Sequence, residues 1–293
     1  MSHFLMKRCL PDLLLLISCL VVIIFQVPTS RADEPTLTAA ARPKRILLLG
    51  QKPDGHPAQS HEYMSGVRLL AKLLQNRGGV QAVVVQADNP WTEGPELLDG
   101  ADGAVLFLSE GAKWLSGDLK RLAAFQRLAK RGGGLTVLHW GMGTREVAPV
   151  EKFVSLFGHC HGGPDRKYKV LTTTIQPSKE PHPVLSGIAP IEVHDEFYYA
   201  LKRAPHVERL VPLIRVSLDD ADQTVAWVWE RPDGGRSFGF SGLHFHANWQ
   251  HVEYRRLVLQ GVLWSIGQSI PAEGHTVDVA EADLVPAPQQ VAR

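Results

Sequence analysis

The sequence predicts an α/β fold: an open parallel sheet with helices on both faces, and added β-hairpin segments in the second half of the chain. The first observation is that four short, almost wholly apolar segments alternate with helical patterns over residues 44–139. Strands without polar alternation are typical of parallel sheets buried on both faces. The second observation is that glycine- or proline-rich loops separate these segments, as strand–helix alternation requires. A length of 293 residues suits one large domain better than two.

In the first half, the apolar runs predict strands at residues 44–50, 80–86, 104–109 and 135–139. We expect the first helix to begin near Ser60 as its N-cap, with Glu62 in the first turn, where a negative charge is favourable. Gly78 and Gly79 would end it. A short helix around residues 97–98 and an amphipathic helix over residues 118–131 complete this half.

The second half is less regular. Its composition favours strands at residues 170–176, 191–199 and 207–216. A hairpin follows, with strands Ala226–Glu230 and Arg236–Phe240. The turn between them contains Pro232 and Gly234, and proline presets φ while glycine accepts a positive φ. Residues 252–266 predict the last helix, and the residues from 273 show no clear periodicity.

The N-terminus has the pattern of a secretory signal peptide. Lys7 and Arg8 precede an apolar run from Leu13 to Phe25, and Ser30-Arg31-Ala32 is a small-x-small cleavage site. We therefore expect a signal peptide (1–32), a linker (33–43), one domain (44–271) and a C-terminal tail (272–293), with export to the periplasm or the extracellular space. The alternative is that the segment is retained as an anchor, which would be the chain's sole contact with a membrane.

Composition and missing motifs exclude several function classes. The 31 basic and 30 acidic residues nearly cancel, and no basic stripe or nucleic-acid motif is present, so a nucleic-acid partner is not expected. Cys160 is the one cysteine after the signal, which rules out an intramolecular disulfide. The loop after Gly50 lacks Gly-x-Gly-x-x-Gly, so no nucleotide cofactor is predicted. Gly-x-Ser-x-Gly is absent as well, which argues against an α/β-hydrolase. The sequence does not indicate an oligomeric state.

Histidines gather at the predicted strand ends. His61 follows the first strand, His139 closes the fourth, and His244 and His246 follow the last. The carboxyl ends of parallel strands meet at one rim of the sheet, where ligands bind. If strand geometry continues through His244-Phe245-His246, both imidazoles point to one face. These four histidines are candidate ligands of a divalent metal, zinc or similar.

A carboxylate and four aromatic residues could complete such a site. Glu196 is a candidate general acid/base, together with His139. A sugar ring could stack on aromatic side chains, and the candidates are Trp140, Tyr198, Tyr199 and Trp249. The competing interpretation is structural: each histidine would hydrogen-bond to backbone, and the aromatic side chains would be packing.

The sequence resembles the ThuA-like (trehalose utilisation) family over residues 44–271. The stretches that carry the resemblance are 44–50 with His61-Glu62, 134–139, 182–187, Asp195–Tyr199 and 225–249 with the helix at 257–267. The resemblance implies a flavodoxin-like fold similar to class I glutamine amidotransferases. Leu138-His139-Trp140-Gly141 lacks the nucleophilic cysteine of those enzymes, so their mechanism is excluded at that position. Where relatives carry a histidine-containing loop after the third strand, this chain has Glu110-Gly111-Ala112, and Glu110 could take that role.

The family is associated with disaccharide utilisation, through 3-oxo sugar intermediates. The resemblance therefore implies an exported protein that hydrolyses or isomerises a 3-oxo (oxidised) glycoside, with a small-molecule sugar as its partner. A second hypothesis is a non-catalytic carbohydrate-binding or accessory domain that uses the same pocket. A third is an inactive amidotransferase-like scaffold for protein contacts, which an exposed apolar patch of more than a few hundred Å² would favour.

Overall fold

The computed structural model describes residues 42–75, 77, 79–205 and 209–287. Residues 41–293 form one compact unit. The expected signal peptide, all of the linker except residues 42–43, and the last six residues lie outside the described part of the chain. Within that part, no helix combines the length and the apolar character needed to cross a membrane.

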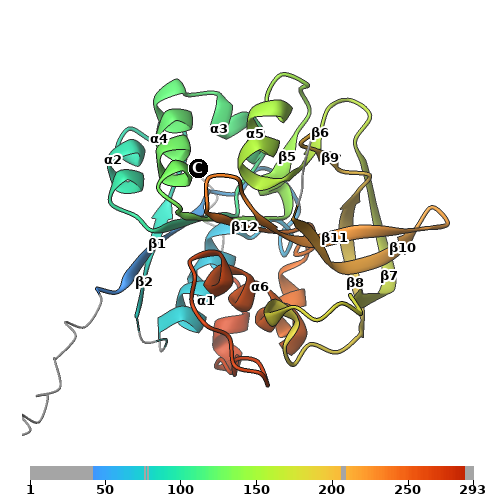
Figure 1. Cartoon of the computed structure of the whole chain (residues 1–293). Coiled ribbons are helices and arrows are strands. Elements are labelled where there is room, and N and C mark those ends of the chain that lie inside the picture. The colour runs from blue at the N-terminus through green and yellow to red at the C-terminus, as the bar shows by residue number, and fades with distance from the viewer. Residues whose placement is uncertain (1–41, 76, 78, 206–208, 288–293) are drawn as a thin grey trace, which may run out of the picture. The chain divides into compact units, whose positions relative to one another are not determined.

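The fold is α/β and is organised around a large, mixed central sheet, as the sequence predicts (Figure 1). Among the described residues its strands run in the order β2-β1-β3-β4-β12-β11-β10-β7-β8. The parallel part consists of β1 (Lys44–Gly50), β2 (Val80–Gln86), β3 (Gly103–Leu106), β4 (Gly134–Leu138) and β12 (Arg236–Phe240). The antiparallel extension consists of β11 (Ala221–Glu230), β10 (Leu210–Leu218), β7 (Lys167–Pro177) and β8 (Ile191–Tyr199).

Helices cover both faces of the parallel part (Figure 1). One face packs against α1 (Tyr63–Gln75) and α6 (Val252–Ser265), and the other against α2 (Gly94–Asp99), α3 (Gly111–Ser116), α4 (Leu119–Lys130) and α5 (Val150–Phe157). Along β1, Leu48 joins the first core cluster, while Leu47 and Leu49 join the second. Because successive side chains point to opposite faces, a strand between two helical layers must be apolar throughout, which explains the unbroken apolar runs.

The first helix begins later than we predicted. Ser60 is not its N-cap: its backbone forms a bridge with Phe245. The next residue, His61, has a positive φ of 53°, which is incompatible with the first turn of a right-handed helix. The helix therefore begins at Tyr63, and Glu62 precedes it.

Other departures concern short elements. His159–Gly162, expected to be a loop, forms strand β6, which pairs with β5 (Gly143–Thr144) and β9 (Lys202–Arg203) in a small second sheet. The sequence analysis did not predict α3 or α5. Both are shorter than the helices that hydrophobic periodicity identifies well. The described part of the tail packs on the domain, since Arg255 Nε donates to the carbonyl of Val277, whose side chain is buried.

Candidate functional site

Three histidines from distant parts of the sequence meet at the carboxyl-terminal rim of the sheet. His61 lies between β1 and α1, His139 directly follows β4, and His244 lies in the loop after β12. All three are buried, and one ring nitrogen from each lies within 4.8 Å of the others. The structure thus brings together three of the four histidines that the sequence proposed as metal ligands.

The backbone is strained at two of these histidines. His139, at the strand-to-helix turn after β4, has φ 45°, and His61 has φ 53°. Such conformations cost of order 1–3 kcal/mol and cluster at functional sites. The turn at His139 also needs close backbone approach, because a Cβ on Gly111 would lie 1.9 Å from the carbonyl oxygen of Gly141. The packing of α3 against this turn therefore holds His139 in place.

The hydrogen bonds of His139 determine which of its ring nitrogens carries the proton. Its Nδ1 lies 2.7 Å from the backbone carbonyl oxygen of Ser241, and a carbonyl can only accept. The neutral ring therefore carries its proton on Nδ1, and Nε2 presents a lone pair. Around that Nε2 lie His61 Nε2 at 3.0 Å, His244 Nδ1 at 3.2 Å and the hydroxyl of Tyr198 at 3.0 Å.

The position of the proton on the His61 ring follows from its contacts in the same way. Its Nδ1 lies 3.0 Å from Asp54 Oδ2, and the hydroxyl of Tyr63 donates to the same carboxylate oxygen at 2.7 Å. Although burial raises the pKa of Asp54, hydrogen bonds from His61, Tyr63 and His56 hold it well below the usual value. The ionised carboxylate keeps the His61 proton on Nδ1, so Nε2 of His61 presents a second lone pair.

Two imidazole lone pairs therefore face each other across 3.0 Å. A shared proton would relieve the repulsion, but burial, together with the charges of His61 and His244, lowers the pKa of His139 well below its usual value. A bound cation would relieve the repulsion as well. Zinc–nitrogen bonds of 2.0–2.1 Å in tetrahedral geometry place ligand nitrogens roughly 3.3 Å apart, close to the separations here. The contacts of His61 with Asp54 and of His139 with a carbonyl are those that orient metal-bound imidazoles.

His244 is positioned by a buried carboxylate. Asp195 accepts from the backbone N–H groups of Leu243 and His244 at 2.7 and 3.0 Å, and from the hydroxyl of Tyr254 at 3.1 Å. Burial raises the pKa of Asp195 to about 7, against the hydrogen bonds that lower it. Burial lowers the pKa of His244 to about 4, so its imidazole is neutral and able to bind a metal near neutral pH.

Glu196 and the aromatic residues extend the site into a pocket of about 320 Å³. Glu196 Oε1 lies 3.9 Å from His139 Nε2 and 3.8 Å from His244 Nδ1. Burial raises the pKa of Glu196, against a hydrogen bond from Tyr198. Trp140 and Tyr198 line the same pocket, and Tyr198 also stacks on His139 with ring centroids 4.5 Å apart.

The fourth proposed ligand, His246, does not join the cluster. Strand β12 ends at Phe240, and Leu243 has a positive φ of 77°. The alternation that would place His244 and His246 on one face is therefore lost. His246 begins a 3-10 helix at His246–Gln250 and is absent from the potential metal-binding groups among the described residues.

Two proposed sugar-stacking residues also lie elsewhere. Trp249 is 1% exposed and belongs to the core on the α1 and α6 side. Tyr199 follows Tyr198 on β8, so its side chain points to the opposite face, where its hydroxyl donates to Asp219 at 2.7 Å. Neither residue lines the pocket: strand alternation turns Tyr199 away from it, and Trp249 lies in the 3-10 helix after the loop that carries His244.

Sequence reasoning missed Asp54 and two arginines, Arg145 and Arg166, that line the pocket. Asp54 stands in the loop directly after β1, so the strand-end rule that identified His61 also applied to it. The arginines lie on connections around the small second sheet, which the sequence did not predict. No signal in the sequence ties them to the rim.

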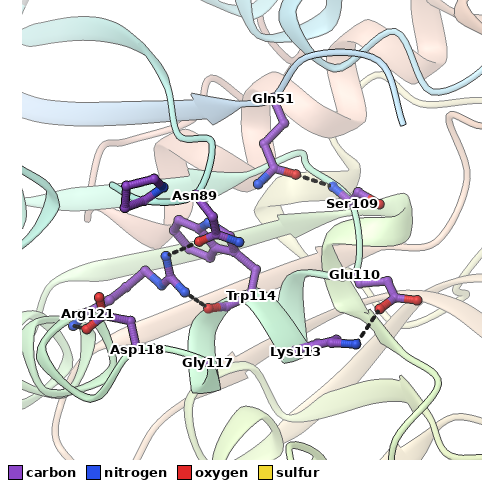
Figure 2. Close-up of a pocket in the computed structure, with 10 residues that line it drawn as sticks. Gln51, Asn89, Ser109, Glu110, Lys113, Trp114, Gly117, Asp118 and Arg121 are labelled. Atoms are coloured by element: carbon purple, nitrogen blue, oxygen red, sulfur yellow. Dashed lines mark hydrogen bonds and ion pairs between the residues drawn. The ribbon is translucent and has the colours of Figure 1, made fainter. Parts of the chain in front are cut away.

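A larger pocket of about 650 Å³ lies beside α3 and the start of α4, and its polar groups bond mainly to one another (Figure 2). The Arg121 guanidinium donates to Asn89 Oδ1 and to the carbonyl of Trp114. Glu110 pairs with Lys113 and Arg145. Its partners are thus cations, and Glu110 does not take the place of a histidine in the cluster.

Comparison with known proteins agrees with the expected family. The family model described as ThuA, trehalose utilisation, matches residues 48–265. A solved structure described as ThuA-like, from Bacteroides uniformis ATCC 8492, matches with a TM-score of 0.61 and 14% identity, covering 80% of this chain and 96% of that one. Another, from Parabacteroides merdae ATCC 43184, matches with a TM-score of 0.58 and 16% identity, covering 83% and 99%.

The structure of PurLQS from Thermotoga maritima also matches, with a TM-score of 0.42 and 14% identity, covering 77% of this chain and 98% of that one. No curated protein sequence matches the chain. At 14% and 16% identity, the likeness to the two ThuA-like structures shows the fold alone. The family match, however, spans well over half of the 293 residues, so the chain belongs to the ThuA (trehalose utilisation) family.

Proposed function

We propose that this protein is an exported, metal-dependent enzyme that hydrolyses or isomerises a 3-oxo glycoside. The observation that carries the proposal is the pair of imidazole lone pairs held 3.0 Å apart, with a carboxylate beside them at the wall of a pocket. Family membership supports carbohydrate as the substrate class. Residues 1–32 support export, and N-terminal sequencing of the exported protein should then begin at Asp33.

His61, His139 and His244 would hold the ion, which leaves one position of a tetrahedral zinc site for a substrate oxygen. A bound divalent ion polarises a carbonyl group and stabilises the charge that develops on its oxygen. Side chains and backbone groups of the protein supply the rest of the site. Asp54 and the carbonyl of Ser241 orient two of the three rings, and Asp195 anchors the backbone that carries His244.

Glu196 is the proposed general acid/base. Its pKa is raised by burial, which moves it toward the range where a carboxyl group exchanges protons effectively near neutral pH. In a 3-oxo sugar, the ketone acidifies the hydrogens on the neighbouring carbons. Glu196 can remove such a proton. In an isomerisation it returns the proton to carbon. In a cleavage the C1–O bond breaks, the departing glycosidic oxygen takes the proton from Glu196, and water adds across the C1=C2 bond that remains, which completes the hydrolysis.

The pocket fits a small sugar. Its volume of about 320 Å³ is at the lower end of the range for small-molecule sites. Trp140 and Tyr198 provide apolar surfaces against which a pyranose ring can pack. The same surfaces suit a non-catalytic sugar-binding domain, and turnover separates the two functions.

The test is turnover of 3-oxo glycosides by the purified protein, before and after chelation and after zinc is restored. We expect activity that chelation abolishes, that zinc restores and that Glu196→Gln removes. Glu192→Gln is the matched control, because Glu192 lies on the same strand but is exposed. Binding of the sugar without turnover would assign the non-catalytic function instead. Turnover unaffected by both chelation and Glu196→Gln would contradict the proposed chemistry.

A further inference from the structure

Two arginines line the same pocket as the histidine cluster. Arg145 and Arg166 both line the pocket, and their guanidinium carbons lie 5.5 and 6.0 Å from the centroid of the Trp140 ring. They come from different connections, Arg145 after β5 and Arg166 just before β7. Two guanidinium groups therefore approach one aromatic wall of the proposed substrate site.

These arginines are not neutralised within the pocket. Arg166 donates to the carbonyl of Gly163 at 3.2 Å, and it makes no ion pair with a carboxylate in the described part of the chain. Arg145 is paired with Glu110, which lines the neighbouring larger pocket. Its side chain is nevertheless 60% exposed, which leaves guanidinium N–H groups available.

The cation–π contacts with Trp140 are too weak to explain why two arginines lie at this pocket. Cation–π attraction is significant within about 6 Å of a ring centroid and is worth ~0.5–1 kcal/mol at exposed sites. Both arginines lie near the outer end of that range. A half-buried guanidinium without a carboxylate partner retains its capacity for charge-assisted, bidentate hydrogen bonds, which carboxylate and phosphate groups satisfy.

The other ionisable groups that line the pocket add little positive charge to that of the arginines. Among the described residues, Glu196 is the carboxylate that lines the pocket, and it lies 3.9 Å from His139 and 3.8 Å from His244 without pairing with either arginine. His61 and His161 are buried, and burial lowers the pKa of both, so neither adds a positive charge near neutral pH. A ligand in this pocket can therefore contact the proposed catalytic groups and the two arginines together.

We propose that the site selects sugars that carry a peripheral oxyanion, with Arg166 as the main specificity residue and Arg145 as its partner. This inference rests on the proposed function, since it concerns the same pocket. The oxyanion is a carboxylate, as in uronates, or a phosphate monoester. Either group would pair with the arginines while the sugar ring packs against Trp140 and its reacting end faces Glu196.

The test is equilibrium binding of three probes to the full-length protein by isothermal titration calorimetry. The probes are methyl glucuronide, methyl glucoside 6-phosphate and methyl glucoside, which differ in the group at carbon 6. We expect at least one anionic probe to bind about tenfold more tightly than the neutral one, because one charge-assisted hydrogen bond is worth about that ratio. The anion that gains more identifies the carboxylate or the phosphate class.

Arginine variants test whether Arg166 and Arg145 cause the preference for anionic probes. Arg166→Met should reduce it to about twofold or less, and Arg166→Lys should retain part of it. Arg215→Met, at an exposed arginine on β10, should leave it unchanged. Thermal melts of each variant confirm the fold. Because only binding is measured, the result does not depend on turnover or on the metal.

Equal affinity of the wild type for all three probes, or no binding of any, would overturn the inference. So would a preference for anions that survives Arg166→Met combined with Arg145→Met. None of these results removes metal-dependent turnover of a neutral 3-oxo glycoside, so failure of this inference and failure of the proposed function are distinguishable.

Discussion

At the residue scale, the chemistry of the site depends on where protons are fixed. A backbone carbonyl accepts from Nδ1 of His139, and the Asp54 carboxylate accepts from Nδ1 of His61. Each contact is ordinary by itself. Together they leave two lone pairs facing each other in a buried place where burial lowers the pKa of both rings. The distance between the two Nε2 atoms alone would suggest a hydrogen bond. Because both rings carry their proton on Nδ1, neither Nε2 can donate, and we therefore propose a cation site.

The one buried cysteine should be chemically inert. Cys160 is fully buried, its thiol donates to the carbonyl of Met142, and burial raises its pKa above the usual value. We expect a disulfide-exchange reagent to titrate the same number of thiols in the native wild type and in Cys160→Ser, and one more in the wild type after unfolding. Cys160→Ser should also keep turnover. Rapid labelling of native Cys160, or loss of turnover with an intact fold, would restore a thiol mechanism.

At the element scale, the loop after β12 carries the least regular part of the site. Strand β12 ends at Phe240, and a positive φ at Leu243 turns the chain. The Asp195 carboxylate on β8 holds the backbone N–H groups of this loop, including that of His244. β8 lies at the far edge of the sheet from β2, so a long-range contact sets the position of His244, one of the proposed metal ligands.

Asp195→Asn should loosen this loop. An amide cannot accept all of the hydrogen bonds that the carboxylate accepts, so the free energy of unfolding should fall by about 1–3 kcal/mol. Zinc affinity should fall by about tenfold, which is typical when a group that orients a metal ligand is lost. Calorimetric zinc titration and thermal melts measure the two effects. Asp219→Asn, at the surface partner of Tyr199, is the control that should leave zinc affinity unchanged. Equal zinc affinity in Asp195→Asn and the wild type would rule out this positioning role.

At the scale of the whole molecule, the sequence predicted the parallel part of the sheet well, because strands such as β1 are apolar on both faces and turns separate them clearly. It also placed His61, His139 and Glu196 near one rim, since strand ends converge there. It could not place His246 or Trp249, because the chain direction after Phe240 depends on the Asp195 contact from a distant strand. The pocket arginines depend on the small sheet of β5, β6 and β9, whose short strands carry too little periodicity to be recognised.

Buried histidines should make the metal-free protein sensitive to acid. Burial lowers the pKa of His159 to about 4, of His161 to about 3 and of His246 to about 4. The unfolded chain binds these protons near pH 6.5, so stability is constant above that value and falls as the pH drops toward 4. Asp195, with its raised pKa, acts in the opposite direction, but the histidines outnumber it. Melts with chelator present should show a falling Tm between pH 6.5 and 4. A Tm that is flat or rising over this window would contradict the burial of these rings as neutral groups.

The most direct test of the central claim is a calorimetric zinc titration of the chelator-stripped protein, with His139→Ala and His246→Ala as the matched pair. We predict that the wild type and His246→Ala bind one zinc ion per chain at this site. We predict that His139→Ala loses it, because His139 Nε2 lies within 3.2 Å of a nitrogen from each of the other two rings. The wild-type affinity should fall as the pH drops, since ligand imidazoles must be neutral. A wild type that binds no zinc, or unchanged binding in His139→Ala, would contradict the metal site.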